Sequence, residues 1–271
     1  MINNQLNREA QDFLLYISFG ITKEDIDNKK DIVEKCSKAA YSDLARTIKY
    51  TYSTSELNNM KSEVRKDFQN KKEKAISNVS TYIKGRINIL ACGSIVQFDT
   101  WHNKTCQVIQ SIMNMARFGI ERESLLGEKI TFGQSQKWLN MTLKNLWLLD
   151  TLPKSISEEY LHAPIDNYIL QAVFESSLDN KTLNTKPKET TIKNGNKTLT
   201  IKRENKTDFY IISQEGTQSW SRISDYDDYK TVQEFIRTIA KKDNSIPIKW
   251  ESKKWIEIAK LRSIDSEISN N

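Results

Sequence analysis

The sequence of 271 residues is poor in the residues that interrupt helices or build metal centres. Its eight glycines and four prolines leave long stretches in which helical periodicity can continue without a break. Its three cysteines, Cys36, Cys92 and Cys106, form no paired spacing, and His102 and His162 are its only histidines. These counts argue against a disulfide framework, a four-cysteine iron–sulfur cluster and a multi-histidine metal site, so we expect neither a metal nor a cofactor.

Long apolar runs are also missing from the chain. No stretch approaches the roughly eighteen apolar residues that a membrane-spanning helix needs, and hydrophobic residues make up 38% of the sequence. The opening residues, MINNQLNREAQDF, lack the basic and then apolar order of a secretory signal. We therefore expect a globular, cytoplasmic protein with no membrane contact and no obligate protein partner.

The charge balance is basic, with 41 Lys and Arg against 35 Asp and Glu and a net charge of +6. Residues 181–206, here called the basic segment, carry eight Lys and Arg but only Glu189 and Glu204 as acids. The net charge of this one segment, +6, equals the net charge of the whole chain. It predicts an extension that lies along a phosphate backbone, with Lys193, Lys197, Lys202 and Arg203 as DNA contacts. The alternative is a solvated, lysine-rich insertion.

Helical periodicity dominates the first two thirds of the chain and returns at its end. Ser53 precedes Glu56 by three residues and offers an N-cap for one of the expected helices. The expected helices cover approximately residues 6–17, 23–50, 56–90, 99–118, 122–126, 134–149, 164–174, 226–241 and 253–262.

From Glu189 onwards the hydrophobic period changes from that of a helix to that of a strand. Residues 191–193 and 198–202 flank Asn194-Gly195, which predicts a β-hairpin, and residues 209–212 predict a third strand. We therefore expect a mainly α fold with two helical lobes around a cleft and a small β insertion. It forms a single domain over residues 1–271, divided into a helical core (1–180), the basic β insertion (181–215) and C-terminal helices (216–271).

Residues 131–171 contain the most informative motif. Gln136-Lys137 lies in the first turns of an amphipathic helix, Lys144 follows seven residues later, and Pro164-Ile165-Asp166 opens the next good helix. This order resembles the catalytic core of the helix-hairpin-helix DNA glycosylases, and especially their archaeal 8-oxoguanine branch. The resemblance covers about forty residues and implies a helix-hairpin-helix core that includes residues 125–171.

The resemblance implies chemistry for two side chains. Breaking the C1′–N glycosidic bond passes through a state with oxocarbenium character, which the carboxylate of Asp166 would stabilise. Lys137 would be the amine nucleophile, and the nearby cation Lys144 would help to lower its pKa from the reference of about 10.4. Without the resemblance, Asp166 is an ordinary helix N-cap and Lys137 an ordinary surface lysine.

The hairpin departs from the more familiar members of the family. Their compact Leu-Pro-Gly-Val/Ile-Gly turn holds a DNA phosphate on backbone N–H groups at a helix N-terminus. Here Gly127 and Gly133 are separated by five residues with no proline between them. The corresponding DNA contacts would come from the backbone at Gly133 and Gln134.

A flipped base must be held by stacking and by hydrogen bonds to its edges. Aromatic and amide side chains around the motif are the candidates, although aromatic residues at helical spacing are more often core. The expected substrate-binding residues are Trp101, His102, Gln136, Asn140, Met141, Lys144, His162 and Trp220.

The resemblance implies a DNA glycosylase that acts on double-stranded DNA carrying a modified base. The Asn-, Lys- and Ile-rich composition is typical of a low-GC bacterium. Some bacterial glycosylases of the type that this chain resembles remove hypermodified bases from phage DNA, so the resemblance implies a role in phage defence, with a hypermodified (glucosylated) cytosine as the expected excised base. One alternative is an 8-oxoguanine repair glycosylase with lyase activity, and another is a non-catalytic DNA-binding module. A HEPN-type ribonuclease is disfavoured because neither histidine has an arginine five residues before it.

Overall fold

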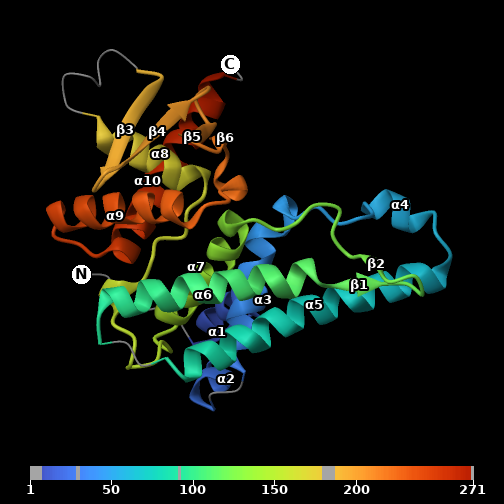
Figure 1. Cartoon of the computed structure of the whole chain (residues 1–271). Helices are drawn as coiled ribbons and strands as arrows, with labels where there is room; N and C mark the ends of the chain where they lie inside the picture. The colour runs from blue at the N-terminus through green and yellow to red at the C-terminus, as the bar shows by residue number, and fades with distance from the viewer. Residues whose placement is uncertain (1–7, 29–30, 91–92, 179–186, 270–271) are drawn as a thin grey trace. The chain divides into compact units, whose positions relative to one another are not determined.

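The computed structural model describes residues 8–28, 31–90, 93–178 and 187–269, and within them it is mainly helical with two small antiparallel sheets (Figure 1). The mainly α prediction is therefore confirmed. The chain divides into two compact units, which are described separately. The N-terminal unit comprises Met1–Gly93, Gln107–Ile130 and Met141–Ile156, and the C-terminal unit comprises Ser94–Cys106, Thr131–Asn140 and Ser157–Asn271. The expected single domain stays a prediction.

The N-terminal unit is built on two helices, α3 (Ile32–Leu44) and α5 (Ser62–Asn88), which lie side by side (Figure 1). Buried residues at helical spacing explain why α5 packs here, since Val79, Ile83 and Ile87 recur every four residues on one face. The unit contains α1 (Arg8–Phe19), α2 (Lys23–Asp27), α3 (Ile32–Leu44), η1 (Ala45–Thr47), α4 (Thr54–Asn58), α5 (Ser62–Asn88), β1 (Arg117–Phe118), β2 (Glu123–Ser124) and parts of α6 (Ile95–Asn114) and α7 (Phe132–Leu148).

Three helix predictions in this unit need correction. The helix expected over residues 23–50 is divided into α2 and α3, with positions 29–30 outside the described residues. Ser53 does cap a helix, in a capping box with Glu56, but that helix ends at Asn58 and α5 begins at Ser62. The short helix expected at 122–126 is wrong. Arg122 has a φ of +57°, which no α-helix contains, and the next two residues form β2.

The C-terminal unit joins helices to a four-stranded antiparallel sheet, whose strands lie in the order β3 (Glu189–Asn194), β4 (Lys197–Arg203), β5 (Phe209–Ser213) and β6 (Gly216–Gln218). Helix α8 (Asn167–Ser177) contacts β3, β4 and β5, and helix α9 (Tyr226–Lys242) contacts β3 and β4. Besides parts of α6 and α7, the unit contains η2 (Glu158–Tyr160), α8 (Asn167–Ser177), β3 (Glu189–Asn194), β4 (Lys197–Arg203), β5 (Phe209–Ser213), β6 (Gly216–Gln218), η4 (Trp220–Arg222), α9 (Tyr226–Lys242) and α10 (Pro247–Ser269).

The predicted β-hairpin and third strand are confirmed. Asn194 pairs with Lys197 across the turn, where Gly195 has the φ of +58° that a tight hairpin requires. Alternate side chains on the strands are buried, including Ile192, Leu199 and Ile201. Strand β6 was not predicted, because its three residues carry no strand pattern of their own. Within the described residues, every helix is too short or too polar to cross a membrane.

Candidate active site

Asp166 occupies the N-cap position of α8, as its place after Pro164-Ile165 predicts. Its backbone is extended, with φ −137° and ψ −172°, and its Oδ1 accepts hydrogen bonds from the backbone N–H groups of Tyr168 and Ile169 at 2.9 and 3.0 Å. These bonds satisfy two of the helix donors that would otherwise lack partners. One carboxylate oxygen is thus used to begin the helix, while Oδ2 faces other groups.

Lys137, from the second turn of α7, meets that second oxygen. Its Nζ donates to Asp166 Oδ2 at 2.8 Å, and both residues belong to the C-terminal unit. The lysine side chain is 7% exposed and the aspartate side chain 15%. Burial alone would raise the pKa of Asp166, but the Lys137 ammonium and the α8 amides outweigh it and lower the pKa. The structure therefore brings the two predicted catalytic residues together as an ion pair with a charged carboxylate.

A third element completes the surroundings of Asp166. The indole Nε1–H of Trp255, on α10, donates to Asp166 Oδ2 at 3.2 Å. The Trp255 ring stacks on Tyr168 with centroids 4.8 Å apart, and the guanidinium of Arg262 lies 4.2 Å from the Tyr168 centroid. Trp255 remains 38% exposed. This aromatic stack was not predicted, because nothing in the local pattern of α10 relates it to a residue 89 positions earlier.

Buried amides hold the backbone on either side of the pair. Gln136 Nε2 donates to the carbonyl of Ile165 at 3.1 Å, so the residue before Lys137 is bonded to the residue before Asp166. Asn140 Nδ2 donates to Gln136 Oε1 and to the Tyr229 hydroxyl, both at 2.9 Å. These bonds fix the start of α7 against the loop that leads into α8, and thereby fix the separation of the pair.

The two histidines extend this buried network. His102 Nε2 lies 2.8 Å from Asn140 Oδ1, and His162 contacts the Tyr229 hydroxyl at 2.7 Å and Asp99 Oδ1 at 2.8 Å. Burial lowers the pKa of His162 to about 4, although its hydrogen bond to Asp99 acts in the opposite direction. Burial likewise lowers the pKa of His102 well below its usual value. Both imidazoles are therefore neutral at pH 7.

Asp99 is the charged end of the network. Arg237 binds it through two guanidinium nitrogens, Nη2 to Oδ1 at 2.6 Å and Nη1 to Oδ2 at 3.1 Å. Burial alone would raise the pKa of Asp99. Its bonds to His162 and Arg237 outweigh that effect, so the pKa of Asp99 is lowered from its usual value. The Asp99–Arg237 pair thus anchors the histidine network to α9.

Four of the predicted base-reading residues are buried in this network. Gln136, Asn140 and His102 are 0% exposed and His162 is 2% exposed, and all four hydrogen-bond within the chain. A base edge needs an accessible donor or acceptor, which these side chains do not present. In this structure their hydrogen bonds hold the backbone segments that carry Lys137 and Asp166.

The remaining predicted pocket residues are two tryptophans and two residues of α7. Trp101 and Trp220 are 7% and 9% exposed, and Trp101 packs against Phe98 with centroids 5.5 Å apart. Both indoles therefore belong to the core. Met141 and Lys144 are half-buried positions of α7 that fall in the N-terminal unit.

The start of α7 is covered by the protein's own chain. Gly133 N donates to the carbonyl of Ile223 at 2.8 Å, and a Cβ on Gly133 would lie 2.0 Å from the carbonyl oxygen of Trp220. The Gln134 side chain accepts from Thr131 N at 2.9 Å, while Gln134 N donates to the Thr131 hydroxyl at 3.2 Å, which completes a cap. Intramolecular acceptors therefore occupy the backbone amides of Gly133 and Gln134, the two predicted phosphate contacts, and a phosphate would have to displace these acceptors to bind there.

Some cations of the basic segment form ion pairs within the chain, and others are exposed. Lys197 forms ion pairs with Asp225 and Asp228, both at 2.7 Å, and Lys202 pairs with Glu204 at 2.7 Å. Lys193 is exposed on β3. The guanidinium of Arg203 lies 5.6 Å from the Phe174 ring centroid. Lys181 and Lys186 lie outside the described residues.

Among the described residues, His, Cys, Asp and Glu side chains form no group of three or more that could hold a metal ion. Neither protein-family models, nor curated proteins, nor solved structures contain a match to this chain.

Proposed function

We propose that the protein is a DNA glycosylase that releases a modified base and leaves an abasic site. The observation that carries the proposal is the 2.8 Å contact between Lys137 Nζ and Asp166 Oδ2 in the C-terminal unit. The motif at residues 131–171 assigns Lys137 and Asp166 to this chemistry independently of the contact between them. Their direct contact, their low exposure and the lowered pKa of Asp166 support it.

The chemistry follows from the charge of Asp166. When the C1′–N bond breaks, the bonding electrons leave with the base, which gains a proton, and positive charge develops on the sugar. A carboxylate held charged beside C1′ stabilises that state, and addition of water then yields the abasic sugar and releases a proton. Removal of one such electrostatic partner typically costs a hundred- to a thousandfold in rate.

Lys137 acts first as the counter-ion of Asp166. Attack by its amine on C1′ requires loss of a proton, and the carboxylate at 2.8 Å is a weak base because the pKa of Asp166 is lowered. The resting ion pair therefore favours water as the nucleophile. Covalent attack by Lys137 would require substrate binding to separate the pair.

The segment between α6 and α7 differs from the compact hairpin of the familiar glycosylases. Helix α6 and helix α7 are joined through a short β ribbon and a loop, and the α7 start is occupied by Ile223. DNA binding by the amides of this helix start is accordingly not part of the proposed mechanism. The proposal retains the Lys137 helix and the Pro164-Ile165-Asp166 helix opening.

A glucosylated cytosine of phage DNA is the proposed substrate. Trp255 offers a partly exposed aromatic face beside Asp166, and rings of this kind bind both bases and sugars by stacking. A site that hydrogen-bonds the hydroxyls of a glucosyl group discriminates strongly against bases that lack them.

The test is single-turnover release from three duplexes that differ at one base: glucosylated hydroxymethylcytosine, 8-oxoguanine and unmodified cytosine. Abasic sites are scored for the wild type and for Asp166→Asn. We expect the fastest release from the glucosylated duplex and its loss in the variant. Faster release of 8-oxoguanine would make the chain a repair enzyme, and binding of all three duplexes without release would leave only a DNA-binding module.

A further inference from the structure

A basic cavity of about 470 Å³ lies in the N-terminal unit between α5, the end of α6 and the β1–β2 ribbon. Lys71 and Lys74 line it from α5, and Arg117 and Arg122 line it from the ribbon. Of the described residues that line this cavity, none is a carboxylate. Four cations therefore line one cavity, and the adjoining carboxylate of Asp67 is hydrogen-bonded to the backbone N–H of Gly119. This excess of positive charge attracts a polyanion.

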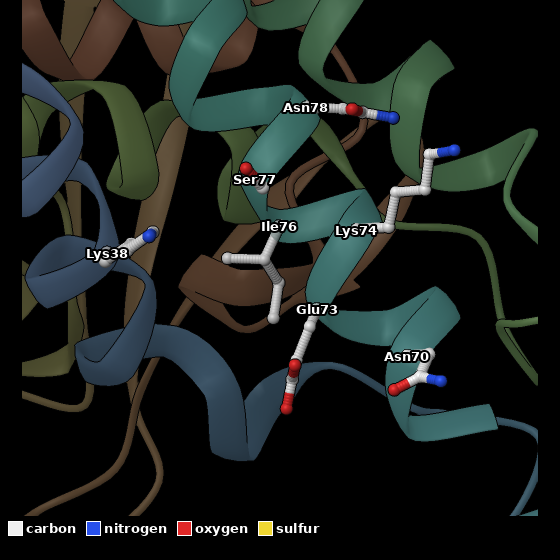
Figure 2. Close-up of a pocket in the computed structure, with 7 residues that line it drawn as sticks. All are labelled: Lys38, Asn70, Glu73, Lys74, Ile76, Ser77 and Asn78. Carbon is white, nitrogen blue, oxygen red and sulfur yellow. The ribbon is translucent and has the colours of Figure 1, made fainter. Parts of the chain in front are cut away.

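A second cavity of about 570 Å³ continues this surface towards α3. Lys74 and Asn78 line both cavities, and Lys38 of α3 adds a further cation (Figure 2). Figure 2 shows Lys74 and Asn78 pointing to one side of α5, while Glu73 points to another. The two cavities together present five cations and one carboxylate. We call them the α5–ribbon surface.

The ribbon side of this surface is built rigidly. Arg117 donates from Nη1 to the carbonyls of Asn114 and Ala116 at 2.8 and 2.9 Å, so its guanidinium is held at the end of α6. Gly119 N donates to Asp67 Oδ2 at 2.8 Å, which ties the ribbon turn to α5. Cations with restricted side chains lose less entropy on binding than freely rotating ones.

Aromatic packing also holds the β1–β2 ribbon against α5. Phe118 lies edge-on to Phe68 of α5 with ring centroids 5.0 Å apart, and both rings are buried. The turn above them places Ile120 completely in solvent, and Met115 is 73% exposed at the cavity wall. A protruding apolar tip beside arginines suits a ligand that offers phosphates together with an apolar groove or base edges.

We propose that the α5–ribbon surface binds the phosphate backbone of duplex DNA. A single phosphate would need one cavity, whereas the shared Lys74 makes the cationic surface continuous over two. Helix α5 has 27 residues and is therefore about 40 Å long, comparable with one turn of B-DNA. The choice of DNA rests on the proposed function, but the surface and its charge do not.

Binding of an unmodified 20-base-pair duplex, measured by fluorescence anisotropy over a salt series, tests this inference without any excision step. The variant is the full chain with Lys71→Gln and Arg122→Gln. Removal of one phosphate contact lowers the log–log salt slope by about 0.9. We expect a slope smaller by about two and a Kd raised at least tenfold near 100 mM salt.

The matched control carries Arg65→Gln and Lys66→Gln, which remove the same charges from exposed positions of α5 outside both cavity walls. Circular dichroism confirms that both proteins fold. An unchanged slope in the cavity variant, or equal losses in both variants, overturns the inference, as does tighter binding of an RNA duplex at the same surface. Loss of base release in Asp166→Asn with this DNA affinity intact separates the proposed function from the inference.

Discussion

Lys137 and Asp166 form a short ion pair, with Nζ 2.8 Å from Oδ2, although 29 positions separate them in the sequence. The C-terminal unit contains a close counterpart in Lys197 and Asp225. Asp225 is also a helix N-cap, and it also pairs with a lysine, at 2.7 Å. The two aspartates differ in exposure, because the Asp166 side chain is 15% exposed and that of Asp225 is 40% exposed. The second pair therefore supplies a matched control.

Asp166→Asn should fold yet lose most base release. Asparagine remains a good N-cap and can accept from the Tyr168 and Ile169 amides, but it carries no charge to stabilise an oxocarbenium ion. We expect a loss of a hundredfold or more, about 3 kcal/mol of barrier, in single-turnover abasic-site formation. Asp225→Asn makes the same chemical change at the other N-cap and should retain wild-type release. Equal losses in the two variants would assign the effect to stability.

Lys137→Gln distinguishes a water nucleophile from an amine nucleophile. Because the nearest proton acceptor, Asp166, is a weak base, borohydride should trap little covalent complex between the wild type and substrate DNA. The variant should still lose release, since it removes the group that orients Asp166 Oδ2. Lys197→Gln is the control for loss of a lysine paired with an N-cap. A strong borohydride adduct that disappears only in Lys137→Gln would establish Schiff-base chemistry instead.

Features encoded by neighbouring residues could be predicted from the sequence. The Ser53 cap, the Asn194-Gly195 hairpin and the Asp166 N-cap all depend on side chains within a few positions of the backbone they control. The pairing of Asp166 with Lys137 is not local, and only the resemblance of the motif pointed to it.

Features that depend on distant backbone could not be predicted. Trp255 reaches Asp166 only because α10 packs on α8, and the amide of Gly133 is covered only because the chain returns at Ile223. The polar character of His102 and His162 suggested a binding pocket, whereas tertiary packing buries both in a hydrogen-bonded network. A single sequence does not distinguish a buried polar network from an open polar site.

Acid should destabilise the protein before its carboxylates titrate. His162 has a folded-state pKa of about 4, below the value of 6.5 in the unfolded chain, and the pKa of His102 is also depressed. Between these values the unfolded chain binds more protons, so stability is full above about pH 6.5 and falls as the pH decreases towards 4. His162 and His102 both contribute to this loss, because burial disfavours the charged form of each imidazole.

Urea denaturation at several pH values between 7 and 4.5 measures this effect. The His162→Gln variant removes one titrating group from the contacts with Asp99 and Tyr229, so its free energy of unfolding should vary less steeply with pH, whatever its absolute stability. A wild-type free energy of unfolding that stays constant over this range would show that the imidazoles are not buried in neutral form.

The basic segment should contribute unevenly to DNA affinity. Lys193 is exposed on β3, whereas Lys197 is already held by Asp225 and by the buried Asp228. Lys193→Gln should therefore lower the log–log salt slope of duplex binding by about 0.9, and Lys197→Gln should change it little. A larger change in the Lys197 variant would mean that DNA displaces its two aspartates, and would restore its predicted role as a phosphate contact.

Gly133 should tolerate no side chain. An added Cβ would lie 2.0 Å from the Trp220 carbonyl oxygen, a backbone atom that cannot rotate away, so the α7 start would have to separate from residues 219–223. Overpacking of this kind typically costs about 1–3 kcal/mol, and Gly133→Ala should lower the thermal midpoint accordingly.

Gly85→Ala is the control for that substitution. Gly85 lies inside α5, and a Cβ added there would meet nothing within 4 Å, so alanine should stabilise the helix by about 0.5–1 kcal/mol. The two identical substitutions should thus shift the calorimetric midpoint in opposite directions. Because the start of α7 also carries Lys137, Gly133→Ala should reduce base release even at temperatures where the variant is folded. A Gly133→Ala protein as stable and as active as the wild type would show that the return of the chain over α7 is not part of the native fold.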